Sequence, residues 1–316
     1  MTRVAYLTAS CMIAGSPDER ADAWEHAAEM RALVPACAAR GIQLEEAVWN
    51  DPALPVQDYA AFVIGTTWDY QEQTPAFLAR LEELEAHAPV LNSLQTVRWN
   101  LHKRYLNDLE DRGLRIVPTA WVEQLTAAQI EAQCAAWGCD AVVVKPGIGA
   151  GAWRQARIER GAPLPPAEEL PPVLAHPLGH TMVQPFLPSI QTEGELSFLF
   201  FDRQFSHCLR KRPQPGDYRV QALYGGAEEV HPPSEEEMRF AQSVAEALGD
   251  ELLYARVDLV RLPDQQLAVI ELELIEPYFY PEQGPECGPL FAAGLRRRLD
   301  ETSSNYFAAA ASRPTP

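Results

Sequence analysis

The chain has 316 residues, of which 47% are hydrophobic and 22% are charged, and its formal net charge is -18. A chain of this length can bury a sizeable core and is expected to divide into two or three domains. So negative a protein repels phosphate-rich polymers, which excludes nucleic acid and anionic membrane surfaces as expected partners. Any phosphate that it binds must therefore meet a local basic pocket.

The cysteines and apolar runs indicate the compartment. Six cysteines are scattered without CxxC spacing, so we expect neither a disulfide framework nor a zinc site. Buried thiols of this kind are typical of a reducing compartment, and we predict a cytoplasmic location. The apolar stretch Val4–Gly15 resembles a signal peptide, but it is short, has one basic residue and leads directly into a predicted capped helix. No run reaches the roughly eighteen apolar residues that a membrane span requires.

The first ninety or so residues alternate between strand-like and helix-like segments. The predicted strands are Val4–Thr8, Gln43–Trp49, Ala61–Gly65 and Val90–Asn92, and the predicted helices are Pro17–Ala39 and Pro75–His87. This alternation is typical of a small parallel α/β domain. We expect the first helix to begin at Ser16, because Ser16 and Glu19 can form a capping box and Pro17 suits the first helical position.

The middle of the chain predicts a smaller unit. Its predicted elements are a helix Thr96–Asp111, a strand Arg115–Val122, a helix capped by Thr126 with Gln129, and strands Ala141–Lys145 and Thr181–Phe186. Between the last two strands, the proline-rich segment Arg160–Pro177 is expected to be a surface excursion.

The last third of the chain contains mainly strand-like segments, which predict an antiparallel sheet with helices on one face. The predicted strands are Glu195–Arg212, Tyr218–Ala222, Leu253–Arg261 and Gln266–Ile275, with a helix capped by Ser234 with Glu237 among them. A terminal helix and a loose tail, Ser312–Pro316, complete the chain. The fold class is therefore α/β followed by α+β.

Lysine is rare in this chain, which has 26 basic residues but only the lysines Lys103, Lys145 and Lys211. A compact ammonium group suits a phosphate, whereas Arg brings a broad planar fork. Lys145 ends an apolar strand and precedes a glycine-rich loop, VVVKPGIGAGAWR, at 142–154. The glycines of that loop allow close approach of backbone amides to a phosphate. The loop is not a Walker A motif, and an ordinary turn explains it equally well by itself.

A predicted hairpin carries three carboxylates. With a period of two, Glu271 and Glu273 point to one face, and a turn at Asp264 and Gln265 would set Asp258 directly opposite Glu271. Like charges so close are unfavourable unless protons or a dication neutralise them, and hard oxygen ligands suit magnesium. The alternative is the solvated acidic face of an edge hairpin.

A basic cluster lies on two segments joined by a short Pro/Gly turn, and consists of Arg210, Lys211, Arg212 and Arg219. It can hold a triphosphate or a substrate carboxylate, although a solvated strand face explains it as well. The arginines at 296–298 lie in the predicted terminal helix and are expected to be surface charge.

Four motifs give the chain a family resemblance. They are WDY at 68–70, RWNLHKRYLNDL at 98–109, KRPQPGDYRVQ at 211–221 and ELELIEP at 271–277. In this order they resemble the ATP-grasp superfamily, specifically the glutathione synthetase-like ligases, over nearly the full length. They are most similar to a bacterial subfamily that includes a D-cycloserine-forming ligase. The resemblance implies an N-terminal α/β domain at 1–95, a central ATP-grasp subdomain at 96–183 and a C-terminal subdomain with the metal site at 184–316.

The resemblance also implies roles for individual residues. The implied nucleotide contacts are Lys103, Lys145, Gly147, Gly149, Gly151, Gln184, Pro185, Phe186 and Lys211, with Glu193 or Glu195 for the ribose. The implied magnesium ligands are Asp258, Glu271 and Glu273, and the implied catalytic residues are Lys145, Arg212 and Arg219. Two residues depart from the pattern: Glu273 replaces the usual Asn, and His102 replaces a frequent Asp. We interpret His102 and His207 as structural.

The implied reaction transfers the γ-phosphoryl group of magnesium ATP to a small carboxylic acid, after which an amine attacks the acyl phosphate. Intramolecular cyclisation is a second possibility, and an ATP-binding regulatory module without ligase chemistry is a third. The acceptor pocket is expected near Thr67, Trp68 and Asp69. The sequence leaves the carboxylate, the nucleophile and any homo-oligomer undetermined.

The rarity of lysine generates a testable prediction. Lys145→Ala should weaken ATP binding or phosphoryl transfer by a factor on the order of 10 to 100, because it removes one or two charge-assisted contacts. Isothermal titration with ATP and steady-state turnover measure the two effects. Equal ATP affinity and turnover in Lys103→Ala and Lys145→Ala would refute the assignment of these lysines to nucleotide.

Overall fold

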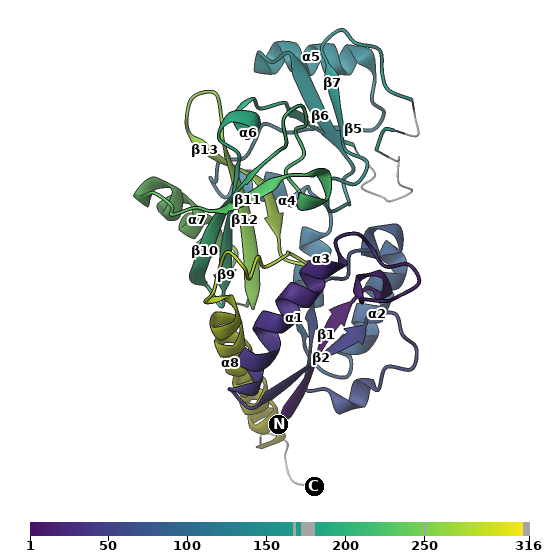
Figure 1. Ribbon diagram of the computed structural model, residues 1–316, viewed down its shortest axis with the longest axis vertical. Helices are drawn as coiled ribbons and strands as arrows, with labels where there is room; N and C mark the ends of the chain where they lie inside the picture. The colour runs from purple at the N-terminus through teal and green to yellow at the C-terminus, as the bar shows by residue number, and fades with distance from the viewer. Residues whose placement is uncertain (167–168, 172–180, 250, 312–316) are drawn as a thin grey trace.

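The computed structural model describes residues 1–166, 169–171, 181–249 and 251–311. Three β-sheets follow one another along the molecule (Figure 1). A parallel sheet near the N-terminus occupies the base, a five-stranded sheet lies in the middle, and a four-stranded sheet lies at the top. The predicted combination of parallel α/β and antiparallel α+β structure is confirmed.

The parallel sheet has the strand order β2-β1-β3-β4. Its strands are β1 (Thr2–Thr8), β2 (Ile42–Val48), β3 (Ala61–Ile64) and β4 (Val90–Leu91), and its helices are α1 (Ala23–Ala38) and α2 (Thr74–Glu85). All three strand pairs are parallel, as predicted. β3 is buried on both faces, which is why it reads as a continuous apolar run instead of an alternating one.

The four-stranded sheet at the top is antiparallel, with the order β5-β8-β6-β7. Its elements are β5 (Ala120–Val122), β6 (Ala141–Lys145), β7 (Ala156–Glu159), β8 (Thr181–Pro185) and α5 (Ala127–Trp137). Helix α5 begins with the predicted capping box of Thr126 and Gln129. The predicted excursion Arg160–Pro177 lies partly outside the described residues. Strand β8 runs across residue 183, so the subdomain boundary placed there stays a prediction.

The middle sheet is antiparallel, with the order β11-β10-β9-β12-β13. Its strands are β9 (Glu195–Phe201), β10 (Gln204–Arg212), β11 (Ala227–Val230), β12 (Tyr254–Arg261) and β13 (Leu267–Glu273). The remaining helices are α3 (Leu94–Asn100), α4 (Tyr105–Asp111), α6 (Ser189–Thr192), α7 (Glu235–Ala247) and α8 (Cys287–Ala311). Helix α7 has the predicted capping box of Ser234 and Glu237, and α8 lies alongside α1 (Figure 1). Short 3-10 turns occur at Ser10–Met12, Val56–Asp58, Tyr70–Glu72 and Ala222–Tyr224.

The predicted start of the first helix at Ser16 is wrong, since α1 begins at Ala23. The carboxylate of Glu19 accepts a hydrogen bond from the amide of Gly15 at 2.8 Å, and the hydroxyl of Ser16 has no partner. Gly15 has a φ of 81° and turns the chain, so no capping box forms there.

The predicted helix Thr96–Asp111 is also wrong, because the chain breaks between α3 and α4. At the break, the amide of Lys103 donates to the carbonyl of Gly147 at 2.8 Å. The side chain of Asn100 bonds the carbonyl of Leu272 and the amide of Leu274. Tertiary hydrogen bonds therefore replace the helical bonds that the local sequence favours.

Three predicted strands differ from the structure. Glu195–Arg212 forms two strands, because Asp202 and Arg203 have positive φ and turn the chain back. Tyr218–Ala222 is not a strand, since the carboxylate of Asp217 accepts both the Tyr218 and Arg219 amides and holds a turn. The strand predicted at Arg115–Val122 is shorter, because its first half bonds Val269 of β13 and only Ala120–Val122 joins β8.

Side-chain hydrogen bonds tie the N-terminal sheet to the middle sheet. Asn92, just after β4, donates to the carbonyls of Tyr254 and Leu274 at 2.9 Å each and accepts from the amide of Leu253 at 2.7 Å. Buried backbone groups at the ends of β12 and β13 are satisfied in this way. The N-terminal domain is thus fixed against the strands that carry the acidic residues.

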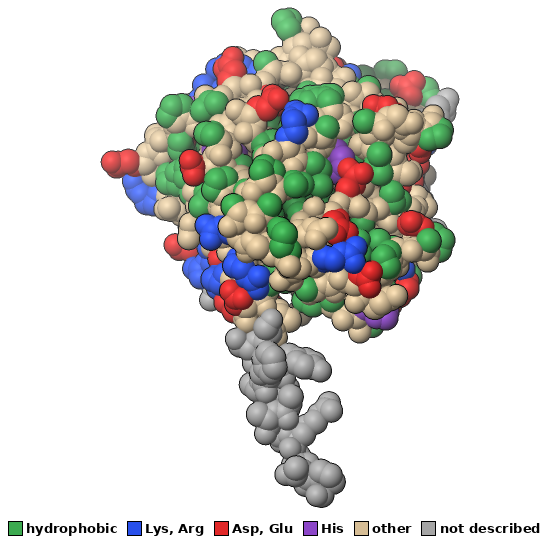
Figure 2. Space-filling view, turned by 60° about the horizontal axis from the view of Figure 1, so that its bottom comes forward, with side chains coloured by type: hydrophobic (Ala, Val, Ile, Leu, Met, Phe, Trp, Pro, Cys, Tyr) green, Lys and Arg blue, Asp and Glu red, His purple; other side chains and the backbone are tan. Residues whose placement is uncertain are grey.

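No helix within the described ranges is long and apolar enough to cross a membrane. The arginines at 296–298 form ion pairs along α8 with Asp202, Asp300 and Glu301. Basic and acidic side chains are likewise mixed over the face of the molecule that Figure 2 shows. The predicted surface position holds for Arg297, whereas the side chain of Arg298 is only 11% exposed and bonds Asp202 and the carbonyl of Leu252.

Glu29 on α1 generates a stability prediction. Its fully buried carboxylate accepts from Tyr6 at 2.5 Å and from the amide of Phe279 at 2.7 Å, and burial raises its pKa to about 8. The folded protein therefore holds a proton that the unfolded chain, with a pKa of 4.5, releases. The contribution of Glu29 to the free energy of unfolding should be complete below pH 4.5 and lost as the pH rises to about 8.

Glu29→Gln cannot ionise, and its amide oxygen can still accept from the Phe279 amide while its NH2 group donates to the Tyr6 hydroxyl. Urea unfolding at several pH values should show a flatter pH profile in this variant, by a few kcal/mol at most, since one pKa unit corresponds to about 1.4 kcal/mol. Parallel pH profiles for the variant and the parent protein would contradict a buried neutral Glu29.

Candidate active site

A first cavity, of about 60 Å³, lies where the top sheet meets the middle sheet. Its apolar walls include Val143, Phe186, Leu187 and Ile270, and its polar lining includes Lys103, Lys145, Gln184, Glu195 and Glu271. The mixture of apolar walls and a few convergent polar groups is typical of a small-molecule site. Strands β6, β8 and β13 therefore bring together most of the residues predicted to contact nucleotide.

The glycine-rich loop covers one side of this cavity through Gly149, Ala150, Gly151, Ala152 and Trp153. Gly151 and Ala152 both have a φ of 58°, in the left-handed region. A side chain at residue 151 would therefore be strained. Gly147 lies behind the lining, where its carbonyl accepts the Lys103 amide. The loop thus lines the cavity with backbone in the left-handed region at two successive residues.

A second cavity, of about 300 Å³, adjoins the first. The two share Ala150, Gly151, Trp153, Glu195, Gln221 and Glu271. The N-terminal domain contributes Arg20, Glu25 and Trp68 to the second cavity. Of the predicted acceptor residues, Trp68 lines it, whereas Asp69 instead accepts a hydrogen bond from Trp49 at 2.8 Å.

The hairpin places its carboxylates at the junction of the two cavities. Asp258 pairs with Glu271 across β12 and β13, which confirms the predicted register. Asp258 is fully buried and accepts from Ser197 at 2.6 Å, from Arg256 at 2.9 Å and from Lys211 at 3.4 Å. A solvated acidic face is thereby excluded for Asp258.

Each of the other two carboxylates also faces a cation. Glu271 pairs with Lys103, and Glu273 pairs with Arg256. All three carboxylates of the hairpin therefore have a cation beside them, and Lys103 and Lys211 come from segments distant in sequence. Within the described ranges, no group of three acidic, His or Cys side chains is arranged to hold a metal.

The pKa values follow these surroundings. Burial opposes ionisation of Asp258, but Arg256 and Lys211 outweigh it and hold its pKa at about 2. Burial likewise opposes ionisation of Glu271, but Lys103 and Lys145 lower its pKa. Burial raises the pKa of Glu273 to about 8 despite Arg256. Asp258 and Glu271 are therefore ionised oxygen donors at neutral pH, which is the donor chemistry that fits magnesium.

All three lysines of the chain line these cavities. Lys103 and Lys145 lie in the first, and Lys211 lies in the second, where it contacts Glu195 at 2.5 Å. Burial lowers the pKa of Lys145, although Glu271 partly offsets it. Lys145 is thus a buried cation whose charged form an anionic ligand would stabilise.

Three predicted site residues lie differently from the others. Arg212 points to β11 and pairs with Glu229 at 2.9 Å, because alternation along β10 turns Lys211 inward instead. Glu193 pairs with Arg261 at the surface at 3.3 Å. Arg219 lines the first cavity but is held by Asp217 at 2.7 Å.

The sequence reasoning missed Arg256, which is buried between Asp258 and Glu273 and lines the second cavity. Strand alternation was the available signal, since residues 256 and 258 share a face of β12. His207 is buried with its Nδ1 near the Ser206 hydroxyl at 2.9 Å, and burial lowers its pKa to about 4. That environment agrees with a structural role.

Comparison with known proteins identifies the family. Residues 4–92 match the family model of the D-cycloserine synthetase DcsG N-terminal domain. The cycloserine biosynthesis protein DcsG of Streptomyces lavendulae is 30% identical over 292 residues, covering 86% of this chain and 94% of that protein. The chain belongs to the DcsG family.

Solved structures agree with this placement. The crystal structure of D-cycloserine synthetase DcsG matches with a TM-score of 0.77 and 26% identity, over 94% of this chain and 99% of that one. D-alanine–D-alanine ligase from Bacillus anthracis, complexed with ATP, matches with a TM-score of 0.62 and 14% identity, over 95% and 100%. Like DcsG, the chain is an ATP-dependent ligase with the ATP-grasp fold.

The ion pair of Lys103 with Glu271 generates a prediction. Repulsion among the three carboxylates, taken alone, would predict that removal of one acidic charge stabilises the protein. The structure predicts the opposite, because Glu271→Gln leaves a buried lysine without its partner. A double-mutant cycle with Lys103→Met, followed by urea unfolding, should give a coupling energy of about 1 to 3 kcal/mol.

The exposed pair Arg212 and Glu229 is the matched control. Its cycle should give less than about 1 kcal/mol, because solvent screens exposed charges. Additive effects of Lys103→Met and Glu271→Gln would show that the two charges do not stabilise each other.

Proposed function

We propose that the protein activates the carboxylate of a small, amino-acid-like substrate as an acyl phosphate and joins it to an amine in the cytoplasm. One observation supports this most directly. The two cavities adjoin and share Glu195, Glu271 and the glycine-rich loop. ATP in the first cavity and a carboxylate in the second would meet at these shared residues.

In the proposal, the apolar walls at Phe186, Leu187 and Ile270 hold the adenine ring. The backbone of residues 184–186 forms hydrogen bonds with the edge of the adenine ring, and Glu195 lies near the ribose. Lys103, Lys145 and the glycine-rich loop receive the phosphates, since a buried ammonium gains most from an anion. Closure of the loop over the phosphates would exclude the water that hydrolyses an acyl phosphate.

Asp258, Glu271 and Glu273 would hold magnesium, which supplies positive charge to the transferring phosphoryl group. In the described structure, these carboxylates are neutralised by Lys103, Lys211 and Arg256. We infer an exchange of partners, in which Lys103 leaves Glu271 for the phosphates. The exchange keeps every buried charge compensated.

Two arginines are the proposed stabilisers of the charge that develops during transfer. Arg219 lines the first cavity. Arg256 lines the second cavity, beside Asp258 and Glu273. Arg212 is not retained in this role, because it pairs with Glu229 on β11.

Intramolecular cyclisation is a second candidate, and the match to D-cycloserine synthetase DcsG favours it. In that reaction the carboxylate and the nucleophile belong to one molecule, so a single substrate cavity is sufficient. The two candidates share the acyl phosphate and differ only in the origin of the nucleophile.

The products test the proposal. Turnover should release ADP and phosphate, because an acyl phosphate forms when the substrate carboxylate attacks the γ-phosphorus of ATP. Hydroxylamine added with the correct carboxylic acid should yield a hydroxamate without any amine. A screen of small acids and amino acids by phosphate release, followed by mass spectrometry, detects both products.

Omission of the amine distinguishes the candidates. A cyclising enzyme turns over a single substrate and forms a product lighter by one water, whereas a two-substrate ligase needs a separate amine. AMP and pyrophosphate as products would rule out the acyl-phosphate mechanism in either case.

A further inference from the structure

Side chains, instead of a further strand, hold the outer edge of β13 around Leu272. β13 is the edge strand of the middle sheet, and the N–H and C=O groups of alternate residues along it point away from β12. Leu272, and Leu274 just after the strand, carry such groups and are each 1% exposed. Backbone groups buried at a sheet edge are unfavourable unless each has a hydrogen-bond partner.

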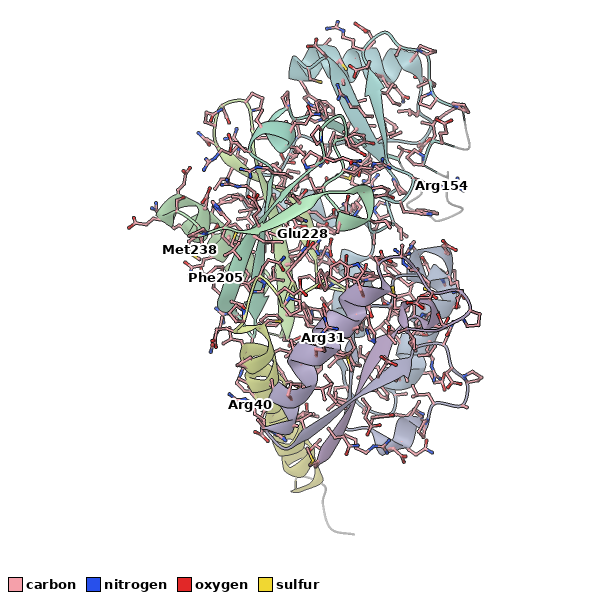
Figure 3. All side chains as sticks on the ribbon, in the orientation of Figure 1. Arg31, Arg40, Arg154, Phe205, Glu228 and Met238 are labelled. Carbon is pink, nitrogen blue, oxygen red and sulfur yellow. The ribbon has the colours of Figure 1, made fainter. Side chains whose placement is uncertain are left out.

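The partners come from the segment that follows β4. This segment joins the N-terminal domain to the middle sheet, and side chains fill the space between the two (Figure 3). The side-chain amide of Asn100 donates to the carbonyl of Leu272 at 3.0 Å and accepts from the amide of Leu274 at 2.9 Å. The hydroxyl of Tyr105 accepts from the amide of Leu272 at 2.9 Å, and Asn92 donates to the carbonyl of Leu274 at 2.9 Å.

The residues bonded at this edge alternate with two of the predicted magnesium ligands. Glu271 and Glu273 lie on either side of Leu272, so the edge fixes their backbone while their side chains line the second cavity. The register of β13 against β12 shifts between Asp258 and Leu259, which disrupts the ladder next to Glu271. Asn100 and Tyr105 therefore supply hydrogen bonds where the ladder with β12 is irregular.

Lys103 lies between these two residues in sequence but holds Glu271 differently. Its ammonium pairs with Glu271, and its amide donates to the carbonyl of Gly147 at 2.8 Å. In the proposed exchange of partners, that ammonium leaves Glu271 for the phosphates. The bonds of Asn100 and Tyr105 to β13 do not involve the ammonium, so they can keep Glu271 in place during the exchange.

We propose that Asn100 and Tyr105 are positioning residues that fix Glu271 and Glu273 for magnesium. Both are buried behind the lining of the two cavities and act through the backbone of β13. Groups outside the ligand shell commonly orient metal ligands in this way. This inference rests on the proposed function, in which the two glutamates hold the metal.

The effect of magnesium on ADP binding tests the positioning role. ADP is titrated by calorimetry with EDTA and with saturating magnesium, and the ratio of the two dissociation constants, the magnesium enhancement, measures the contribution of the metal site. Asn100→Leu is close in shape and removes both hydrogen bonds. Tyr105→Phe removes only the acceptor for the Leu272 amide and is the milder change.

Leu109→Ala is the matched control. Leu109 is a fully buried residue of α4, packs in the same core cluster as Leu272, and has an apolar side chain that cannot hydrogen-bond β13. The cavity left by this substitution should lower the urea midpoint without changing the magnesium enhancement.

Asn100→Leu should reduce the magnesium enhancement on the order of tenfold and Tyr105→Phe about threefold, with ADP affinity in EDTA within about twofold of the parent protein. If Asn100→Leu does not fold, Tyr105→Phe alone decides. A Tyr105→Phe protein with the parent enhancement would overturn the positioning role. An equal loss of enhancement in Leu109→Ala would do the same, because destabilisation would then explain the effect.

Product analysis separates this inference from the proposed function. A parent-like enhancement in both variants, with ADP and a hydroxamate as products, would sink the positioning role alone. AMP and pyrophosphate as products, with an enhancement that depends on Asn100 and Tyr105, would sink the proposed function alone. Equal ADP affinity with EDTA and with magnesium in the parent protein would overturn the metal ligands and the positioning role together.

Discussion

Neutralisation of buried charge at the junction of the two cavities is the constraint on which the rest of the site depends. Five carboxylates meet four cations there, namely Glu195, Asp258, Glu271, Glu273 and Glu276 with Lys103, Lys145, Lys211 and Arg256. Removing an ion from water costs several kcal/mol unless an opposite charge and hydrogen bonds compensate it. The junction therefore resists loss of any single member, and it accepts a charged ligand only if partners are exchanged.

That exchange connects the architecture to ligase chemistry. Lys103 lies at the break between α3 and α4, and its amide is bonded to the glycine-rich loop. Its ammonium reaches Glu271 on β13. One residue thus links the loop, the interhelical segment and the acidic hairpin. Arrival of an anionic nucleotide at this point would alter both the charge balance and the position of the loop.

The second cavity is formed by parts of the chain far apart in sequence. The N-terminal domain supplies Glu25 and Trp68, and the segment after β13 supplies Tyr278 and Tyr280. The hydrogen bonds of Asn92 and Glu29 fix these parts against one another. The top sheet instead has its own small core, which includes Val142, Val144 and Ile158. The substrate side of the site is thus tightly joined, and the loop side is packed as a separate unit.

The sequence by itself determined the features that depend on local pattern. The parallel α/β start, the capping boxes at Thr126 and Ser234, and the pairing of Asp258 with Glu271 follow from periodicity and turn chemistry. Tertiary structure alone decided the partners of the buried charges. Contacts between segments distant in sequence decide whether Lys211 or Arg212 faces inward and where the chain breaks near Lys103. Local propensity does not specify such contacts, because their free energy arises only when the sheets pack together and exclude water.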